Sequence, residues 1–159
     1  MVSLRHIGLI ALCLAWTLPG IVGHDPWKPD EAYTFGVVFE YFRGADWPVP
    51  MLAGEPFLEE PPLYYLVAAG LARLLSPLMA PHDAARLTTA GFMLLTLLFS
   101  GLAARDLNGK GYGTIAVALL LGSFGLVVRG HQLITDVGAL TGFALAYFGY
   151  AGSRRNPLA

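Results

Sequence analysis

Charged residues are scarce in this chain, and their scarcity is uneven. They make up 13% of the 159 residues, against about 25% in an average soluble domain. A helix that crosses the hydrocarbon core of a bilayer needs about 20 mostly apolar residues, within a working range of about 17–25. Four uncharged runs of 17 or 18 residues reach that length, at 7–23, 87–104, 111–128 and 137–153. We therefore predict an all-α integral membrane protein with four transmembrane helices.

Cysteine and runs of basic residues are also nearly absent, which excludes several kinds of protein. Cys13 is the only cysteine, so the sequence excludes an intramolecular disulfide and a cysteine-based metal cluster. The few Lys and Arg residues form no cluster that would indicate nucleic-acid binding, and the net charge of −1 favours no class of partner. The sequence also has no internal repeat.

The N-terminal run is typical of two kinds of segment. Arg5 and His6 precede the apolar residues 7–18, and small residues follow up to Gly23, as in a secretory signal peptide. Ile21 would then occupy a position before the cleavage site that normally holds a small residue, which favours an uncleaved membrane anchor. Both alternatives place the residues after Gly23 outside the cytoplasm.

A fifth apolar stretch, 61–81, is long enough to span the membrane but is predicted to lie along its surface. It begins with Pro61-Pro62 and has Arg73 near its centre. An arginine at the bilayer midplane costs about 2.5–3.5 kcal/mol on an insertion scale, whereas an interfacial helix lets the guanidinium reach water. The positive-inside rule agrees with the resulting topology, which leaves residues 24–85 as an extracytoplasmic loop. The basic residues that it places in the cytoplasm are Arg5, Arg105, Lys110, Arg154 and Arg155.

Within that loop the sequence predicts a first surface helix over residues 30–43. The apolar residues at helical spacing that would face the membrane are Phe35, Val38, Phe39 and Phe42. Glu31 and Thr34 fall outside this apolar face of the helical wheel. We therefore expect two extracytoplasmic juxtamembrane helices, 30–43 and 61–81, over the outer ends of the spans.

Several acidic residues are candidates for chemistry, and each also has a plainer explanation. Asp30 opens a helix, so it is either a helix N-cap or a catalytic carboxylate. Glu31 fits a first-turn acid, and Glu59-Glu60 fit a solvated pair before a proline break. Asp136 lies at the mouth of the last span, where an ionisable residue indicates function unless it caps that helix.

An ordered set of motifs extends along the whole chain and carries a resemblance. The motifs are Asp30-Glu31-Ala-Tyr, Asp46-Trp47, Leu52-Ala-Gly-Glu-Pro-Phe-Leu-Glu-Glu-Pro-Pro-Leu-Tyr-Tyr, Ala84-Ala-Arg86-Leu and finally Asp136. In this order and spacing, the set resembles the N-terminal part of the polyprenyl-phosphate-sugar-dependent glycosyltransferases of the GT-C class. That family includes the lipid A aminoarabinose transferases and the protein O-mannosyltransferases.

The resemblance implies inverting transfer of a sugar from a polyprenyl-phosphate donor to a lipid or protein hydroxyl on the extracytoplasmic face. An acceptor hydroxyl becomes a competent nucleophile when a carboxylate removes its proton. The resemblance assigns that role to Asp30, with Glu31 and Asp136 as supporting acids. The leaving phosphate needs positive charge or a metal nearby. The residues expected to bind substrate are Lys28, Tyr33, Glu59, Glu60, Arg86, Arg129 and His131, although a histidine such as His131 also suits a contact with lipid headgroups.

One position departs from the family pattern. The relatives commonly carry a lysine directly before the Pro-Pro-Leu motif, where it contacts the donor phosphate, and this chain has Glu60 instead. Two explanations remain open. Either Lys28, Arg86 or Arg129 replaces that lysine, or Glu59 and Glu60 hold a divalent metal that does the same work.

The family members are also several times longer than this chain. We therefore expect residues 1–159 to be a single N-terminal membrane module of a glycosyltransferase, in the cell membrane, with its active site on the extracytoplasmic side. The alternative is a catalytically inactive fragment or split subunit that needs a C-terminal partner. A small transporter is a third alternative, which the uncharged interiors of the four runs disfavour.

Overall fold

A computed structural model describes residues 4–27, 29–44 and 48–155 of the chain. Over these residues the fold is mostly helical, as predicted, with seven helices and one two-stranded antiparallel hairpin. The elements in chain order are α1 (Leu4–Thr17), α2 (Asp30–Arg43), β1 (Met51–Leu52), β2 (Glu55–Pro56), α3 (Leu63–Leu75), α4 (Pro81–Asn108), α5 (Tyr112–Leu121), α6 (Phe124–Arg129) and α7 (Thr135–Arg155).

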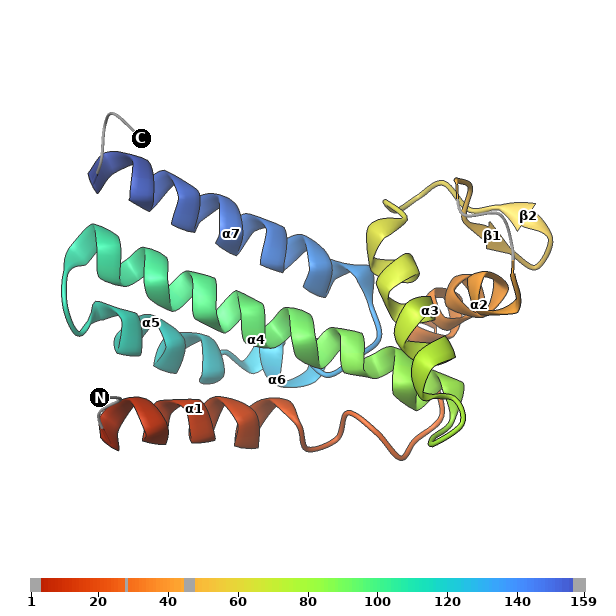
Figure 1. Cartoon of the computed structure of the whole chain (residues 1–159), viewed down its shortest axis with the longest axis horizontal. Coiled ribbons are helices and arrows are strands. Elements are labelled where there is room, and N and C mark those ends of the chain that lie inside the picture. The colour runs from red at the N-terminus through yellow and green to blue at the C-terminus, as the bar shows by residue number, and fades with distance from the viewer. Residues whose placement is uncertain (1–3, 28, 45–47, 156–159) are drawn as a thin grey trace.

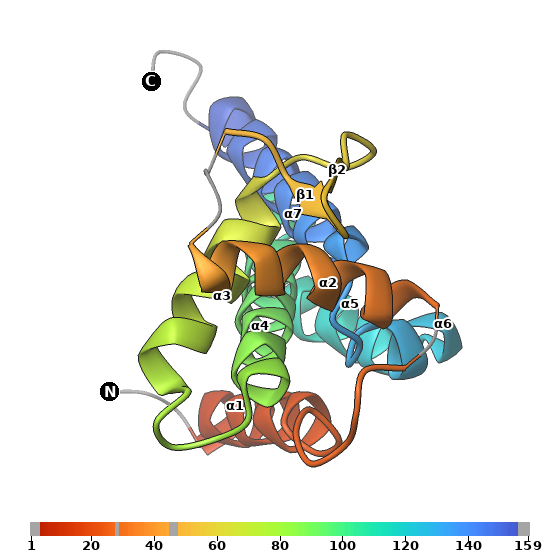
Figure 2. The same cartoon turned by 90° about the vertical axis from the view of Figure 1, so that its right-hand side faces the viewer.

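The longest helix, α4, is the centre of the structure. It packs most extensively against α7 and also contacts α3, α5 and α1. Figure 1 shows α1, α4, α5 and α7 side by side along the long axis, with α2, α3 and the hairpin together at one end. Figure 2 looks at that end and shows α2 crossing it. The fold is therefore a helical bundle with a small cap.

The main apolar core lies between the cap and the bundle. Buried side chains of α3 follow a spacing of four residues, from Tyr64 and Tyr65 to Ala68, Ala69 and Ala72, so they form one face of the helix. The small alanine side chains let α3 lie close to its neighbours on both sides. This contact fixes the position of the cap on α4.

One helix satisfies the length and hydropathy needed to cross a bilayer, among the residues that the structure describes. It is α4, whose 28 residues include the predicted span 87–104. The predicted span 137–153 also lies inside a single helix, α7, but α7 contains Asp136, tyrosines and several glycines and is less apolar. The prediction of four transmembrane helices is therefore not confirmed.

The predicted span 111–128 is not one continuous helix. It is divided into α5 and α6 at Gly122-Ser123, where Ser123 adopts an extended backbone conformation (φ −75°, ψ 114°). Glycine has a low helix propensity because it loses the most backbone entropy, and serine competes for backbone hydrogen bonds. The break releases α6 from the axis of α5 and leads the chain towards the cap.

The predicted span 7–23 is wrong at its C-terminal end. The helix α1 ends at Thr17, and Gly20 has a positive φ of 81°. The reason is local, because Pro19 lacks a backbone N–H and disfavours helical geometry in the residue before it. Residues 18–24 form turns and bends that connect α1 to the cap.

The predicted helix 30–43 is confirmed in its bounds, and it buries within the protein a face that the sequence did not predict. The buried residues of α2 are Glu31, Thr34, Val37, Val38 and Tyr41, whereas Phe39 is 37% exposed. The helix packs on α3, so contacts within the protein decide which side is buried. Glu31 and Thr34, which the sequence places outside the apolar face, therefore lie on the side that is buried within the protein.

The stretch 61–81 forms a helix, α3, of only 13 residues, shorter than a membrane span requires. Its Arg73 side chain is exposed and donates hydrogen bonds to the backbone carbonyls of Phe42 (3.2 Å) and Tyr41 (2.5 Å). These carbonyls belong to the last turn of α2, where helical partners are missing and a cation is favoured. Arg73 thus joins the two helices of the cap.

A close contact between the backbones of α4 and α5 gives a test of the bundle. A Cβ atom on Gly113 of α5 would lie 2.6 Å from the carbonyl oxygen of Gly101 in α4. We expect Gly113→Ala to lower the free energy of unfolding by about 1–3 kcal/mol, as overpacking does. Gly152→Ala is the control, since a Cβ there meets nothing within 4 Å. Thermal unfolding in detergent measures both variants, and equal midpoints would contradict the close contact.

Candidate functional site

A pocket of about 560 Å³ lies where the cap meets the bundle. The first turns of α2 and α7, the end of α6, part of α3 and the loop before α3 contribute its walls. We call it the acidic pocket. Its lining residues are Asp30, Tyr33, Thr34, Phe57, Glu59, Glu60, Tyr65, Arg129, Ile134, Thr135 and Asp136.

Asp30 is the first residue of α2 and faces this pocket. The N-cap position of the helix is held by Pro29, so the predicted alternative of a capping role for Asp30 is not what the structure shows. The Asp30 side chain is 48% exposed, and its Oδ2 atom accepts a hydrogen bond of 2.5 Å from Nη1 of Arg129. Asp30 is therefore a reachable carboxylate held by one guanidinium.

Asp136 lies in the first turn of α7, on the same side of the acidic pocket as Arg129. Its Oδ2 atom is 3.9 Å from Nη2 of Arg129, and its side chain is 71% exposed. A single guanidinium thus lies between Asp30 and Asp136, two acids that are far apart in the sequence. The structure brings both acids to one site, as the sequence-based hypothesis requires.

Glu59 and Glu60 come from the loop before α3 and add negative charge to the pocket. Their effect is visible at Tyr65, another lining residue. Burial is the first cause that raises the pKa of Tyr65 to about 12, and the charges of Glu60 and Glu59 follow. The Tyr65 phenol is therefore neutral at physiological pH.

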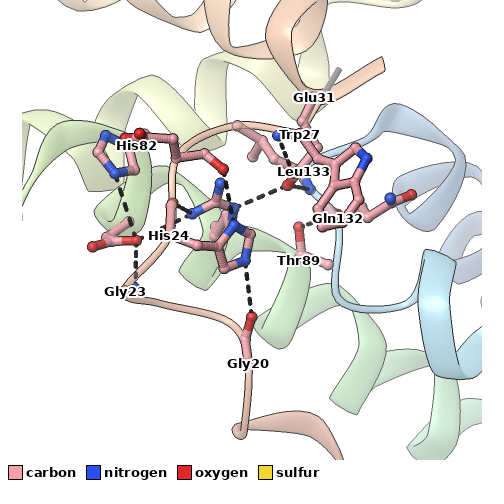
Figure 3. Close-up of polar contacts among 12 residues, drawn as sticks. Gly20, Gly23, His24, Trp27, Glu31, His82, Thr89, Gln132 and Leu133 are labelled. Atoms are coloured by element: carbon pink, nitrogen blue, oxygen red, sulfur yellow. Dashed lines mark hydrogen bonds and ion pairs between the residues drawn. The ribbon is translucent and has the colours of Figure 1, made fainter. Parts of the chain in front are cut away.

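Glu31, the neighbour of Asp30, lies beneath the pocket and not in it. Its side chain is 1% exposed and accepts hydrogen bonds from the backbone N–H groups of Trp27 (2.7 Å) and Leu133 (2.7 Å), and from Nε of Arg86 (2.9 Å). Figure 3 shows Trp27, Glu31 and Leu133 close together, although they come from separate segments of the chain. Burial alone would raise the pKa of Glu31, but the hydrogen bonds from Arg86, Leu133 and Trp27, with the charge of Arg86, lower it below its ordinary value.

Arg86 of α4 completes this buried network. Its Nη1 atom donates to the carbonyl oxygen of His24 (2.7 Å) and to Oδ1 of Asp83 (3.1 Å), and Asp83 also accepts from the N–H of Gly23 (2.9 Å). The Arg86 side chain is fully buried. The network therefore ties the segment after α1, the start of α2 and the segment before α7 to α4.

The remaining predicted site residues are placed as follows. Tyr33 lines the acidic pocket. His131 does not, because its ring packs on Trp16, and its Nε2 atom lies 2.8 Å from the Trp16 carbonyl oxygen. Lys28 lies outside the described residues. Arg86 lies in the buried network described above. Six of the ten predicted site residues line the pocket, namely Asp30, Tyr33, Glu59, Glu60, Arg129 and Asp136.

Sequence reasoning missed several residues of the pocket. Thr34 was recognised only as lying outside the apolar face of α2, and Tyr65 only as part of a motif. Ile134 and Thr135 directly precede Asp136, so their place could have been found from it. Phe57 belongs to the motif before Pro61-Pro62 and gave no separate signal.

The predicted alternative of a metal held by acidic side chains needs several ligands at suitable distances. A divalent metal takes most of its ligands from oxygen, nitrogen or sulfur atoms arranged around one point. Among the described residues, no group of three or more His, Cys, Asp and Glu side chains has that arrangement. Among the lining residues that the structure describes, the positive charge of the acidic pocket comes from Arg129.

Comparison with known proteins reveals a distant similarity. Over 120 residues the chain is 32% identical to the undecaprenyl phosphate-alpha-4-amino-4-deoxy-L-arabinose arabinosyl transferases of Pseudomonas paraeruginosa (strain DSM 24068 / PA7) and Pseudomonas aeruginosa (strain LESB58). The match includes 75% of this chain but 21% of each relative, so the chain spans about a fifth of their length. No protein-family model matches, and no solved structure matches significantly. The chain is thus distantly similar to part of an arabinosyl transferase named for an undecaprenyl phosphate sugar.

Proposed function

We propose that this chain is the membrane module of a glycosyltransferase that moves a sugar from a polyprenyl phosphate to a lipid or protein hydroxyl. The observation that supports this most is the meeting of Asp30, Asp136 and Arg129 in one pocket. A carboxylate accepts a proton, and a guanidinium binds phosphate. Both are needed for this reaction. The distant similarity to an arabinosyl transferase supports the same class of donor.

The proposed reaction is an inverting displacement at the anomeric carbon of the donor sugar. The acceptor oxygen forms a bond to that carbon while the bond from the carbon to the phosphate oxygen breaks. The proton of the acceptor hydroxyl goes to Asp30, and the bonding electron pair leaves with the polyprenyl phosphate. Asp136 orients the acceptor, and Arg129 neutralises charge on the phosphate.

The other residues have supporting roles in this proposal. Tyr33, Glu59 and Glu60 line the pocket and would contact the sugar through hydrogen bonds. Glu31 and Arg86 hold the start of α2 in place and so act on Asp30 from beneath. This assignment changes the part of Arg86, which the sequence-based hypothesis had put at the donor phosphate.

The proposal includes a four-span topology with the acidic pocket on the extracytoplasmic side. Only 39% of the apolar stretch of α4 is buried within the protein, unlike a core helix of a soluble domain. Large apolar side chains are also exposed on the other bundle helices, among them Ile10 at 57%, Leu119 at 71% and Phe143 at 74%. An apolar surface of this extent needs lipid or protein cover.

Cysteine labelling in intact cells tests this topology. In a Cys13→Ser background, single substitutions Ala32→Cys and Thr135→Cys place thiols beside Asp30 and Asp136. We expect a membrane-impermeant maleimide to label both from outside, because Asp30 and Asp136 line the same pocket. Labelling of the residue 135 thiol only after lysis would contradict one shared pocket on the outer face.

Activity of the isolated chain separates the proposal from its alternative. Purified chain in proteoliposomes is supplied with undecaprenyl phosphate 4-amino-4-deoxy-L-arabinose and lipid A, and transfer of labelled sugar is measured. Transfer by the chain alone supports the proposed enzyme. Transfer that appears only with a separately produced C-terminal partner supports the split subunit, and its absence in both samples rejects this donor and acceptor pair.

A further inference from the structure

The acidic pocket has an unusual charge balance for a site that receives a phosphate. Four carboxylates line it, those of Asp30, Glu59, Glu60 and Asp136. Among its lining residues that the structure describes, the positive charge comes from Arg129 alone. An anion that enters this pocket is repelled by the carboxylates unless it reaches the Arg129 guanidinium.

Arg129 already forms an ion pair with Asp30, the candidate base. Its Nη1 atom donates to Oδ2 of Asp30 at 2.5 Å and to Oε1 of Gln132 at 3.2 Å, and its Nη2 atom is 3.9 Å from Asp136. The carboxylate that would take the acceptor proton is therefore engaged in a short hydrogen bond. A phosphate in the pocket and Asp30 compete for the same cation.

The exposure of the pair makes such an exchange feasible. The side chains of Arg129 and Asp30 are 51% and 48% exposed, and half-exposed ion pairs contribute little stability. Phosphate oxygens match the planar fork of a guanidinium in two parallel hydrogen bonds, which a single carboxylate oxygen does not provide. Arg129 is the last residue of α6 and precedes Gly130, so its side chain can turn without moving a packed helix.

We infer that Arg129 is an exchangeable counterion, which moves from Asp30 to the phosphate of the incoming lipid donor and so releases Asp30 to act as base. This inference rests on the proposed function and adds an order of events to it. Before the donor binds, Arg129 holds the Asp30 carboxylate. After the donor binds, Arg129 neutralises the phosphate, and the carboxylate is free to accept a proton.

Binding of farnesyl phosphate to the full chain in nanodiscs tests the exchange without any sugar transfer. Calorimetry compares the wild type, Asp30→Asn, Arg129→Gln and the double variant, with farnesol as the uncharged ligand. Asp30→Asn should bind farnesyl phosphate about two- to fivefold more tightly, because the competing ion pair is removed. Arg129→Gln should bind it about tenfold or more weakly, because the charged hydrogen bonds are lost. Asp25→Asn and Arg43→Gln are matched controls for charge outside the pocket.

The double variant separates exchange from simple repulsion. If Asp30 and phosphate compete for Arg129, adding Asp30→Asn to Arg129→Gln leaves the affinity of Arg129→Gln unchanged. The inference is overturned if the same gain appears without Arg129, if Asp30→Asn alone brings no gain, or if no form binds farnesyl phosphate. If sugar transfer is measured but the variants do not show the expected affinities, the exchange is rejected and the proposed enzyme activity stands. If the variants show the expected affinities but no sugar transfer is measured, the exchange stands and the proposed enzyme activity is rejected.

Discussion

Replacing Asp30 with asparagine is expected to lower the rate of sugar transfer by about 10²–10⁴-fold, the usual contribution of a general base. Asparagine has nearly the same shape and keeps an oxygen that can accept the hydrogen bond from Arg129. It cannot take a proton from the acceptor hydroxyl. The measurement is the initial rate of transfer from the polyprenyl-phosphate sugar in proteoliposomes, at saturating donor.

Two controls distinguish the loss of the base from a general effect of charge or of stability. Asp25→Asn removes one exposed carboxylate from the segment before α2, outside the acidic pocket, and should leave the rate within about twofold, as a surface substitution does. The thermal midpoint of Asp30→Asn should match that of the wild type, because the Asp30–Arg129 pair is half exposed. A rate within about threefold of the wild type would assign the proton transfer to another group.

Local signals in the sequence predicted α2 well, and a local signal also explains the error in α1. The bounds of α2 follow from Pro29 before it and Gly44 after it, where the backbone is left-handed (φ 107°). The early end of α1 follows from Pro19 in the same way, but the apolar run through residue 23 concealed it. Length of an apolar run predicts burial in protein or lipid and does not fix where the helix ends.

The features that the sequence could not predict depend on contacts between segments that are distant in the chain. Glu31 and Arg86 are 55 positions apart, and nothing in the helical spacing of α2 indicates that a glutamate turns inward. The pairing depends on how α2 crosses the end of α4, which is a property of the packed cap. Asp30 and Asp136 were predicted together only through the family resemblance, since their positions in the chain carry no information on distance.

Replacing Arg86 with methionine is expected to destabilise the protein by about 3–5 kcal/mol, the usual effect of removing one partner from a buried ion pair. Glu31 would keep its two backbone N–H donors, from Trp27 and Leu133, but would lose its counterion at a site that is 1% exposed. Arg43→Met, which removes an exposed arginine at the other end of α2, should change stability by less than about 0.5 kcal/mol. Chemical unfolding in detergent at pH 7 measures both variants.

Adding Glu31→Gln to Arg86→Met distinguishes a buried charge from lost packing. Glutamine removes the unpaired charge and keeps an oxygen for the N–H of Leu133, so the double variant should be more stable than Arg86→Met alone. A double variant that is no more stable would assign the whole effect to packing around the missing guanidinium.

The pH dependence of the same variants gives an independent check with a defined sign. Because the pKa of Glu31 is lowered in the folded protein, its contribution to stability is complete above its ordinary value of 4.5 and is lost as the pH falls through the folded value. The wild type should therefore lose stability below about pH 4.5 through this group. In Arg86→Met the burial of Glu31 raises its pKa without an opposing cation, so protonation at mildly acidic pH neutralises the buried carboxylate. The difference in stability between wild type and Arg86→Met should narrow as the pH is lowered from 7, and a constant difference would mean that Glu31 carries no buried charge.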